Sequence, residues 1–315
     1  MLIKVLGSAA GGGFPQWNCG CVQCTRARAG DPAVRPRTQS SIMATADGKR
    51  WVLVNASPDL GKQINDTPAL HPRTRTTNGD GRPRHSPIAA VLVTNADVDH
   101  VAGLLTLRES QAFSLYATAR VQGILGRNSI FNVLNPAHVE RREVSLSSPI
   151  DLVDATGEPL GLEAEIFAVP GKIALWLEDP TKANLGSQPE DTVGLRLRDQ
   201  ASGQEVFYIP GCADLPPALA DRINGAKVVL FDGTTFTNAE MHEQGVGEKT
   251  AQRMGHLAMH GPEGSMAAFS SLDVGRRIYV HINNTNPVLC EDSPERAAVV
   301  AAGWEVAFDG MEITP

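Results

Sequence analysis

Short apolar runs rich in β-branched residues recur along this 315-residue chain, separated by glycine-containing turns and helical stretches. Such runs predict buried strands, and their alternation with helix patterns indicates an α/β protein. The predicted strands cover residues 2–6, 51–55, 89–94, 163–169, 192–197, 205–209, 228–232, 277–282 and 305–309. The predicted helices cover residues 101–107, 117–126, 215–223, 265–272 and 294–302, the last with Ser293 as its cap.

One segment, residues 67–87, differs in kind from the rest of the chain. It holds four prolines and the arginines Arg73, Arg75, Arg82 and Arg84, with little to bury. Loops of this length are usually functional or disordered. Because a predicted strand lies on each side, we expect a mobile loop inserted into a single domain, residues 1–315, rather than a domain boundary.

The overall charge and the sequence of the first residues exclude several classes of function. The formal net charge of −7 argues against nucleic acid as the main partner. The first residues turn polar and glycine-rich at once, so they do not predict a signal peptide. No apolar run approaches the roughly 20 residues that span a bilayer. We therefore expect a cytoplasmic protein without a membrane segment.

The strongest local signal is a cluster of three cysteines, Cys19, Cys21 and Cys24, out of five in the chain. A Cys-x-Cys-x-x-Cys spacing lets three thiolates reach one tetrahedral ion from a tight turn, and zinc is well suited to sulfur ligation. We predict a structural Zn²⁺ site, a zinc knuckle over residues 19–24. The fourth ligand stays open, and a histidine or a loop atom near the last strand would serve.

A second signal follows the predicted strand at residues 89–94. Asp97, Asp99 and His100 lie in a polar turn that leads into a glycine-containing helix. This order places oxygen and nitrogen ligands at the carboxyl end of a strand, where α/β folds assemble their sites. An Asx-rich capping turn is the alternative interpretation of the same residues.

This turn resembles the His-x-His-x-Asp-His signature of the metallo-β-lactamase superfamily, with Asn95 and Asp97 in place of the first two histidines. Further landmarks resemble the superfamily in order: residues 55–59 (NASPD), 208–214 (YIPGCAD), 255–257 (GHL) and the strand histidine His281. The cysteine insertion is similar to one in a phosphodiesterase branch. The resemblance implies a four-layer αββα sandwich.

A narrower resemblance spans the chain from residue 2 to its end. Residues 11–19 (GGGFPQWNC), 231–236 (FDGTTF), 253–256 (RMGH), 281–287 (HINNTNP) and 302–312 (AGWEVAFDGME) resemble the family of pyrroloquinoline quinone (PQQ) biosynthesis B proteins. This family implies hydroxylation of the tyrosine ring of a cross-linked Glu–Tyr precursor of PQQ, with iron and dioxygen. It also carries an alternative, an accessory or carrier role in moving PQQ or its precursor to the periplasm. A metal-dependent hydrolase is a third reading.

Proteins of the superfamily usually bind two metal ions, and the altered signature keeps the ligands of only one of them. Asp99, His100 and His281 keep the pattern of one of the two usual ions, and either Cys212 or Asp214 completes it. Two histidines and one carboxylate form the ligand set of non-haem iron(II) oxygenases. We therefore expect one open site that takes Fe²⁺ or another divalent metal in its place.

The remaining predictions concern residues around this open site. His256, Asn95 and Asp97 are the expected catalytic residues, with His256 as proton donor or substrate contact and the other two lining the pocket. Arg73, Arg75, Arg82 and Arg84 are predicted to bind substrate carboxylates, although plain solubility explains them equally well. The expected partners are the small-molecule precursor and O₂, and a homodimer is compatible with this reading.

Overall fold

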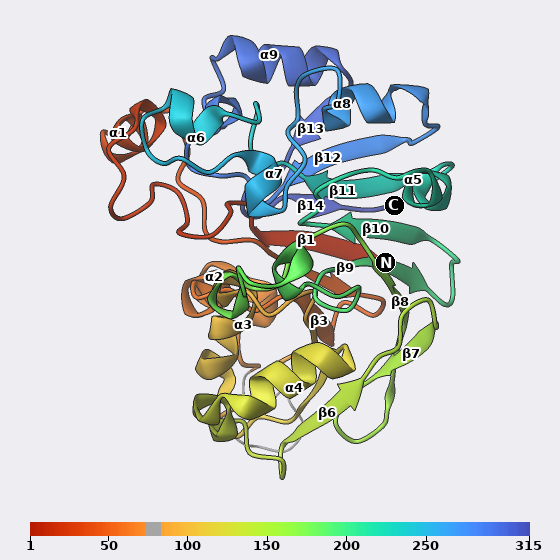
Figure 1. Cartoon of the computed structure of the whole chain (residues 1–315). Coiled ribbons are helices and arrows are strands. Elements are labelled where there is room, and N and C mark those ends of the chain that lie inside the picture. The colour runs from red at the N-terminus through yellow and green to blue at the C-terminus, as the bar shows by residue number, and fades with distance from the viewer. Residues whose placement is uncertain (74–82) are drawn as a thin grey trace.

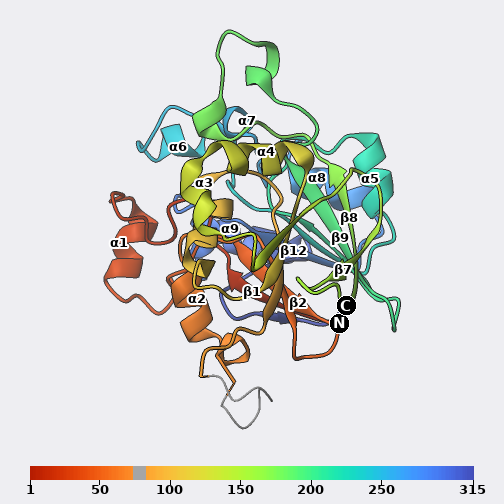
Figure 2. The ribbon, with the colours of Figure 1, turned by 90° about the horizontal axis from the view of Figure 1, so that it is seen from below.

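The computed structural model describes residues 1–73 and 83–315, and the part described forms two seven-stranded β-sheets. Figure 1 shows α2, α3 and α4 together in the lower half of the view and α5, α8 and α9 in the upper half. Figure 2, turned by 90°, shows the chain ends side by side at one corner of the molecule. The fold is the αββα sandwich that the sequence predicts.

The first sheet has the order β14-β1-β2-β3-β4-β5-β6, and β3 to β6 run parallel. Its strands are β1 (Leu2–Gly7), β2 (Ser41–Thr45), β3 (Trp51–Val54), β4 (Ile88–Leu92), β5 (Phe113–Ala117), β6 (Val139–Glu143) and β14 (Glu312–Ile313).

The second sheet has the order β13-β12-β11-β10-β9-β8-β7, and β10 to β13 run parallel. Its strands are β7 (Ile150–Val153), β8 (Pro159–Ala168), β9 (Val193–Asp199), β10 (Glu205–Ile209), β11 (Val228–Asp232), β12 (Arg276–Val280) and β13 (Trp304–Val306).

The helices are short and lie between the strands. They are α1 (Val22–Arg28), α2 (Leu60–Asp66), α3 (Val98–Val101), α4 (Ala119–Arg127), α5 (Pro217–Ile223), α6 (Glu240–Glu243), α7 (Ala251–Met254), α8 (Ser265–Ala268) and α9 (Pro294–Ala301). None of the helices in the described ranges is long and apolar enough to cross a membrane.

The period-two pattern of the strands sorts side chains between the layers. In β4, Ala90 and Leu92 join the apolar layer between the sheets, while Val91 packs with the outer layer of the first sheet. Residues of both sheets form the middle layer, for example Ile42 and Leu195. Strands such as β4, β5 and β11 are thus buried on both faces, which is why they read as continuous apolar runs.

Most predicted elements are present, with shifted ends. Strands 205–209 and 228–232 are confirmed without change, and Ser293 caps α9 by accepting a hydrogen bond from the Arg296 amide. Predicted helix 101–107 is instead a 3-10 helix that follows the short α3. The sequence reading missed β2, β5, β6, β7 and β14.

Candidate metal centre

Polar side chains from both sheets meet at one end of the sandwich. Asp99 and His100 lie in α3, which follows β4 of the first sheet, and His281 directly follows β12 of the second. Carboxyl ends of parallel strands are where α/β folds assemble sites. Together with His256, which follows α7, these residues line a pocket of about 240 Å³.

His281 has an unusual backbone conformation. Its φ of 57° lies in the left-handed region, which a non-glycine residue rarely adopts. Such strain persists only where the surroundings hold it, and it clusters at functional sites. The turn after β12 aims the imidazole back at α3, where Nε2 of His281 lies 3.2 Å from Oδ2 of Asp99.

One carboxylate oxygen of Asp99 lies close to the imidazole rings of both His100 and His281. Its Oδ2 lies 3.2 Å from Nε2 of His281 and 3.8 Å from Nε2 of His100. One ligand atom from each of these residues lies within 4.8 Å of the other two. A single ion can therefore reach one carboxylate and two imidazoles without a change of fold.

An unpartnered nitrogen in His100 supports a metal at this position. His100 is 1% exposed, and its Nε2 has no hydrogen-bond partner among the described residues. Leaving a buried polar atom unpaired is costly, and such atoms usually mark an ion, a water or a catalytic role. A divalent cation beside Asp99 would satisfy this nitrogen, so the residues present fit a bound metal.

The hydroxyl of Thr234 fixes how His281 presents its ring. Thr234 Oγ1 donates to Oδ1 of Asp232 at 2.6 Å, because a carboxylate only accepts. The same Oγ1 lies 2.9 Å from Nδ1 of His281, so that nitrogen carries the proton and donates to it. Nε2 of His281 is then the ring nitrogen that faces Asp99, and it is the one that a metal ion would bind in place of a proton.

The electrostatics of the group suit a cation. Burial lowers the pKa of His100, despite the nearby Asp99 charge, and so favours its neutral form. Burial also lowers the pKa of His281, but the hydrogen bond and the charge of Asp99 outweigh it and raise the net pKa. For Asp99 burial is opposed by the two neighbouring imidazoles, and its pKa is lowered. Asp99 is thus the anionic centre of the group.

A second group, formed by Asp232, His256 and His281, adjoins the first. Asp232 is fully buried, and Nδ1 of His256 lies 2.7 Å from its Oδ2. The same carboxylate accepts hydrogen bonds from the amides of Cys212 and Thr234. Since its oxygens are already engaged, Asp232 acts as an orienting carboxylate that leaves Nε2 of His256 as the free ring nitrogen.

Asn95 and Asp97 line the same pocket, as the sequence predicts, and each accepts a backbone hydrogen bond. Oδ1 of Asn95 accepts a hydrogen bond from the Asp97 amide at 2.9 Å. Oδ1 of Asp97 accepts one from the amide of Leu175 at 3.2 Å. Neither residue belongs to a metal-ligand group among the described residues.

The expectation that Cys212 or Asp214 completes the open site is corrected by the structure. Cys212 is buried in an apolar cluster, with its Sγ 3.0 Å from the Asp214 carbonyl. Asp214 is exposed, and its carboxylate accepts a hydrogen bond from the Leu215 amide. The carboxylate that the sequence analysis missed is Asp232, and its signal was its place at the end of a buried strand.

The three clustered cysteines converge on one point. Their sulfur atoms lie within 4.8 Å of one another, and all three thiols are free of disulfides. Cys21 precedes the first residue of α1, so the turn and the first helical turn bring the thiols together. Asn284 Nδ2 approaches Sγ of Cys24 at 3.4 Å and Sγ of Cys21 at 3.7 Å, and is the neighbour that the group faces.

The two predicted substrate arginines that the structure describes, Arg73 and Arg84, do not line this pocket. Arg73 donates to the Lys49 carbonyl and lines a different pocket at the amino end of β4. Arg84 is exposed, 3.7 Å from Glu109. Arg75 and Arg82 lie outside the described residues. Two lysines that the sequence analysis did not single out, Lys172 and Lys249, line the pocket instead.

An αββα sandwich with candidate metal-binding side chains beyond the strand ends of both sheets defines a metallo-β-lactamase-fold protein. The Beta-lactamase superfamily domain matches residues 50–282. A solved diphosphatase from the PhnP family, 19% identical, has a TM-score of 0.66 and covers 100% of this chain and 97% of its own. At that identity the likeness shows the fold alone.

More similar relatives define a narrower family. Coenzyme PQQ synthesis protein B of Methylobacterium sp. (strain 4-46) is 53% identical over 310 residues, 98% of each chain. The protein of the same name from Xanthomonas oryzae pv. oryzae (strain MAFF 311018) is 48% identical over 313 residues, 99% of each chain. The crystal structure of Zn²⁺-bound PqqB from Methylobacterium extorquens has a TM-score of 0.92 at 50% identity and covers 100% of both chains. The chain belongs to the coenzyme PQQ synthesis protein B family.

Proposed function

We propose that this protein hydroxylates the tyrosine ring of the cross-linked Glu–Tyr precursor during PQQ biosynthesis, with Fe²⁺ at the open site and O₂ as co-substrate. The observation that carries the proposal is the group of Asp99, His100 and His281 with its unpartnered buried nitrogen. Iron(II) held by two imidazoles and one carboxylate activates dioxygen when bound.

The residues around the pocket have distinct roles in this proposal. Thr234 and Asp232 orient the rings of His281 and His256. His256 lines the pocket and takes or gives a proton at the substrate phenol through Nε2, since Nδ1 is held by Asp232.

We propose Zn²⁺ as the ion of the second site. Three thiols of Cys19, Cys21 and Cys24 within reach of one ion form a sulfur-rich set that favours zinc. The Methylobacterium extorquens relative is described as Zn²⁺-bound. Because none of these cysteines lines the pocket of the open site, we assign this ion a structural role.

The test is a single-turnover assay on protein purified without oxygen, freed of metal at the open site and reloaded with Fe²⁺. The cross-linked Glu–Tyr diamino acid is added with labelled O₂ and with ascorbate as the two-electron donor. We expect one labelled oxygen atom in the product and water as the second product. The variants Asp99→Asn and His100→Ala should lose iron and turnover, whereas His242→Ala, an exposed histidine on α6, should keep both.

Two outcomes of this assay overturn the proposal. Turnover that proceeds without O₂, or that takes its oxygen atom from water, points to a hydrolase. Tight binding of the diamino acid or of PQQ with no chemical change in the iron-loaded protein points to the accessory or carrier role.

A further inference from the structure

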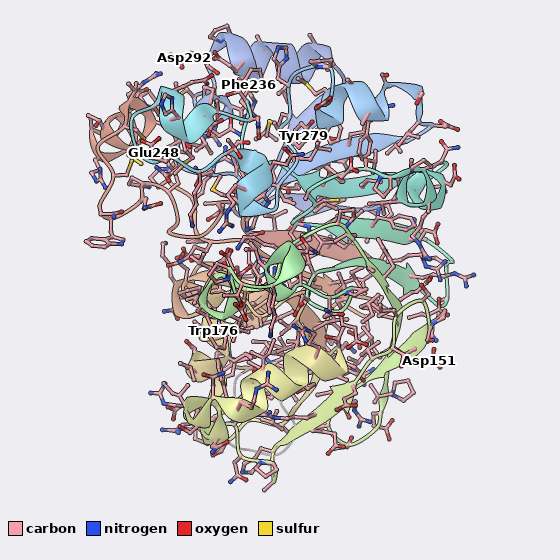
Figure 3. The ribbon with its side chains drawn as sticks, viewed as in Figure 1. Asp151, Trp176, Phe236, Glu248, Tyr279 and Asp292 are labelled. Atoms are coloured by element: carbon pink, nitrogen blue, oxygen red, sulfur yellow. The ribbon has the colours of Figure 1, made fainter. Side chains whose placement is uncertain are left out.

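Two lysines converge on the mouth of the pocket from separate loops. Lys172 follows β8, and Lys249 precedes α7. Figure 3 labels Trp176 and Glu248, close in sequence to these lysines, and shows them on opposite sides of the region between α3 and α7. Lys172 and Lys249 line the same pocket as Asp99 and His281.

The two lysines differ in how they are held. Lys172 is ordered, since its side chain is 17% exposed and its Nζ lies 3.0 Å from Oε1 of Glu178. Glu178 is also bound by both terminal nitrogens of Arg253, at 3.3 and 2.8 Å. These bonds, led by that of Arg253, lower the pKa of Glu178 to about 2. One carboxylate thus holds two cations in place and neutralises only one of them.

Lys249 is exposed and has no ion pair or side-chain hydrogen bond within the described ranges. It lies in the glycine-containing segment before α7, which lets its ammonium group reach an incoming ligand. Of the side chains that line the pocket, Asp97 and Asp99 are acidic and Lys172 and Lys249 are basic. A divalent ion at Asp99 makes the lined space cationic, although the whole chain carries a net charge of −7.

We propose that Lys249 and Lys172 are specificity-determining residues that bind the carboxylates of the substrate and so select an amino-acid-derived polycarboxylate. The inference rests on the proposed function, because it assigns the recognition of that substrate at the same site. Lys249 provides a movable contact and Lys172 a fixed one. Carboxylates held by these ammonium groups stay off the metal, which leaves its open positions for reaction.

The test is calorimetric binding to the Zn²⁺-loaded protein under nitrogen, where no turnover occurs. The probes are the cross-linked Glu–Tyr diamino acid and the dipeptide glutamyl-tyrosine, which carries two carboxylates. We expect Lys249→Gln to weaken binding about fivefold, Lys249→Glu to weaken it further and Lys249→Arg to change it little. Lys172→Gln combined with Lys249→Gln should weaken binding more than tenfold, and the losses should shrink at high salt.

The matched control is Lys182→Gln, an exposed lysine near Asp179 on the same loop as Lys172 but outside the pocket. Metal content and thermal unfolding of Lys249→Gln should equal those of the unmodified protein. In turnover, Lys249→Gln should raise KM and leave kcat nearly unchanged.

The outcomes separate this inference from the proposed function. Equal affinity of the unmodified protein and the double lysine variant for the diamino acid overturns the lysine assignment and leaves the function standing. If the unmodified protein binds the dipeptide in a lysine-dependent way but not the diamino acid, the function fails and the anion site stands. If it binds neither probe, both are overturned.

Discussion

At the scale of single residues, the open site depends on groups that do not bind metal themselves. Thr234 Oγ1 donates to Asp232 and accepts from Nδ1 of His281, so it sets the ring orientation of this proposed ligand. Partners of this kind contribute to metal affinity because they hold the ligand in its binding geometry. The neighbouring Thr235 is also fully buried, but its hydroxyl has no partner among the described residues.

This pair gives a matched prediction. Thr234→Val should lower the affinity of the open site for Fe²⁺ or Zn²⁺ by about tenfold, because His281 loses its orienting acceptor. Thr235→Val makes the same change in size but removes a hydroxyl without a partner among the described residues, so it should leave the metal affinity unchanged. Competition with a fluorescent chelator measures both. Equal losses in the two variants would mean that packing, and not the hydrogen bond, sets metal affinity.

A buried carboxylate on α6 should make stability depend on pH. Burial raises the pKa of Glu240 from 4.5 to about 7, against the hydrogen bonds from Thr285 and the Phe236 amide. The unfolded chain then releases this proton at lower pH than the folded protein does. Stability should therefore fall as pH rises from about 4.5 to about 7, by on the order of 3 kcal/mol from this group.

Glu240→Gln removes the pH-dependent contribution of this carboxyl group to the free energy of unfolding. Denaturant unfolding of both proteins between pH 4 and pH 8 should show the variant gaining stability relative to the unmodified protein as pH rises. A difference in unfolding free energy that stays constant across this range would contradict the raised pKa.

Residue-level sequence reasoning pointed to Asp99 and His100, because a strand followed by ligand-type residues is a local pattern, and to His281 through the superfamily resemblance. It failed for Cys212 and Asp214, since the Gly-x-x-Asp pattern there does not show which side chain turns inward. The carboxylate near the site is Asp232, the last residue of β11. Only the packed sheet shows that it lies beside His256.

At the scale of elements, the segment after β12 connects the two candidate metal sites. His281 belongs to the open group, and Asn284, three residues on, approaches the sulfur atoms of Cys21 and Cys24. The carbonyl of Thr285 accepts a hydrogen bond from Gln23 of α1. The cysteine turn is thus packed against the same stretch of chain that positions a ligand of the open site.

Loss of one clustered cysteine should therefore act first on stability. Cys24→Ser should remove the zinc of this site and lower the melting temperature, because metal-binding energy is lost from folding. Cys290→Ser, a buried cysteine outside the group, should keep the zinc. Elemental analysis and thermal unfolding check both. Unchanged zinc content in Cys24→Ser would show that the three thiols do not form the site.

Elements were predictable where local pattern and burial agreed. Strands β10 and β11 are apolar and buried, and their bounds match the prediction. Strand β6 is Val139–Glu143, and four of its five residues are charged, so no apolar run marks it. It forms because β5 pairs with it at the edge of the sheet. The short helices α6 and α7, of four residues each, leave no periodic pattern.

At the scale of the whole molecule, the open site exists only when the two sheets are packed together. Asp99 lies in α3, which follows β4 of the first sheet, and His281 follows β12 of the second, 182 residues apart in the chain. A metal ion that binds both ties the two sheets to each other. Sequence patterns can indicate a single ligand but not which distant segments the packed sheets bring together. For this reason the pocket-lining lysines were found only in the structure.

Metal binding should consequently stabilise the fold as a whole. At a free metal concentration 100 times the dissociation constant, the gain is about 2.7 kcal/mol if the unfolded chain does not bind. The unmodified protein should melt at a higher temperature with Fe²⁺ or Zn²⁺ at the open site than without it. Asp99→Asn should lose this gain, and an equal gain in the variant would place the binding energy elsewhere.

The central claim is that Asp99, His100 and His281 hold one ion at an open site. The most direct measurement is anomalous diffraction at the iron edge from crystals of protein reloaded with Fe²⁺ without oxygen. The account predicts one iron peak in the pocket, bound by Nε2 of His100, Nε2 of His281 and the Asp99 carboxylate, with the remaining positions open to the pocket. Two iron peaks of equal height, the second held by Asp232 and His256, would contradict it and indicate the two-metal site of a hydrolase.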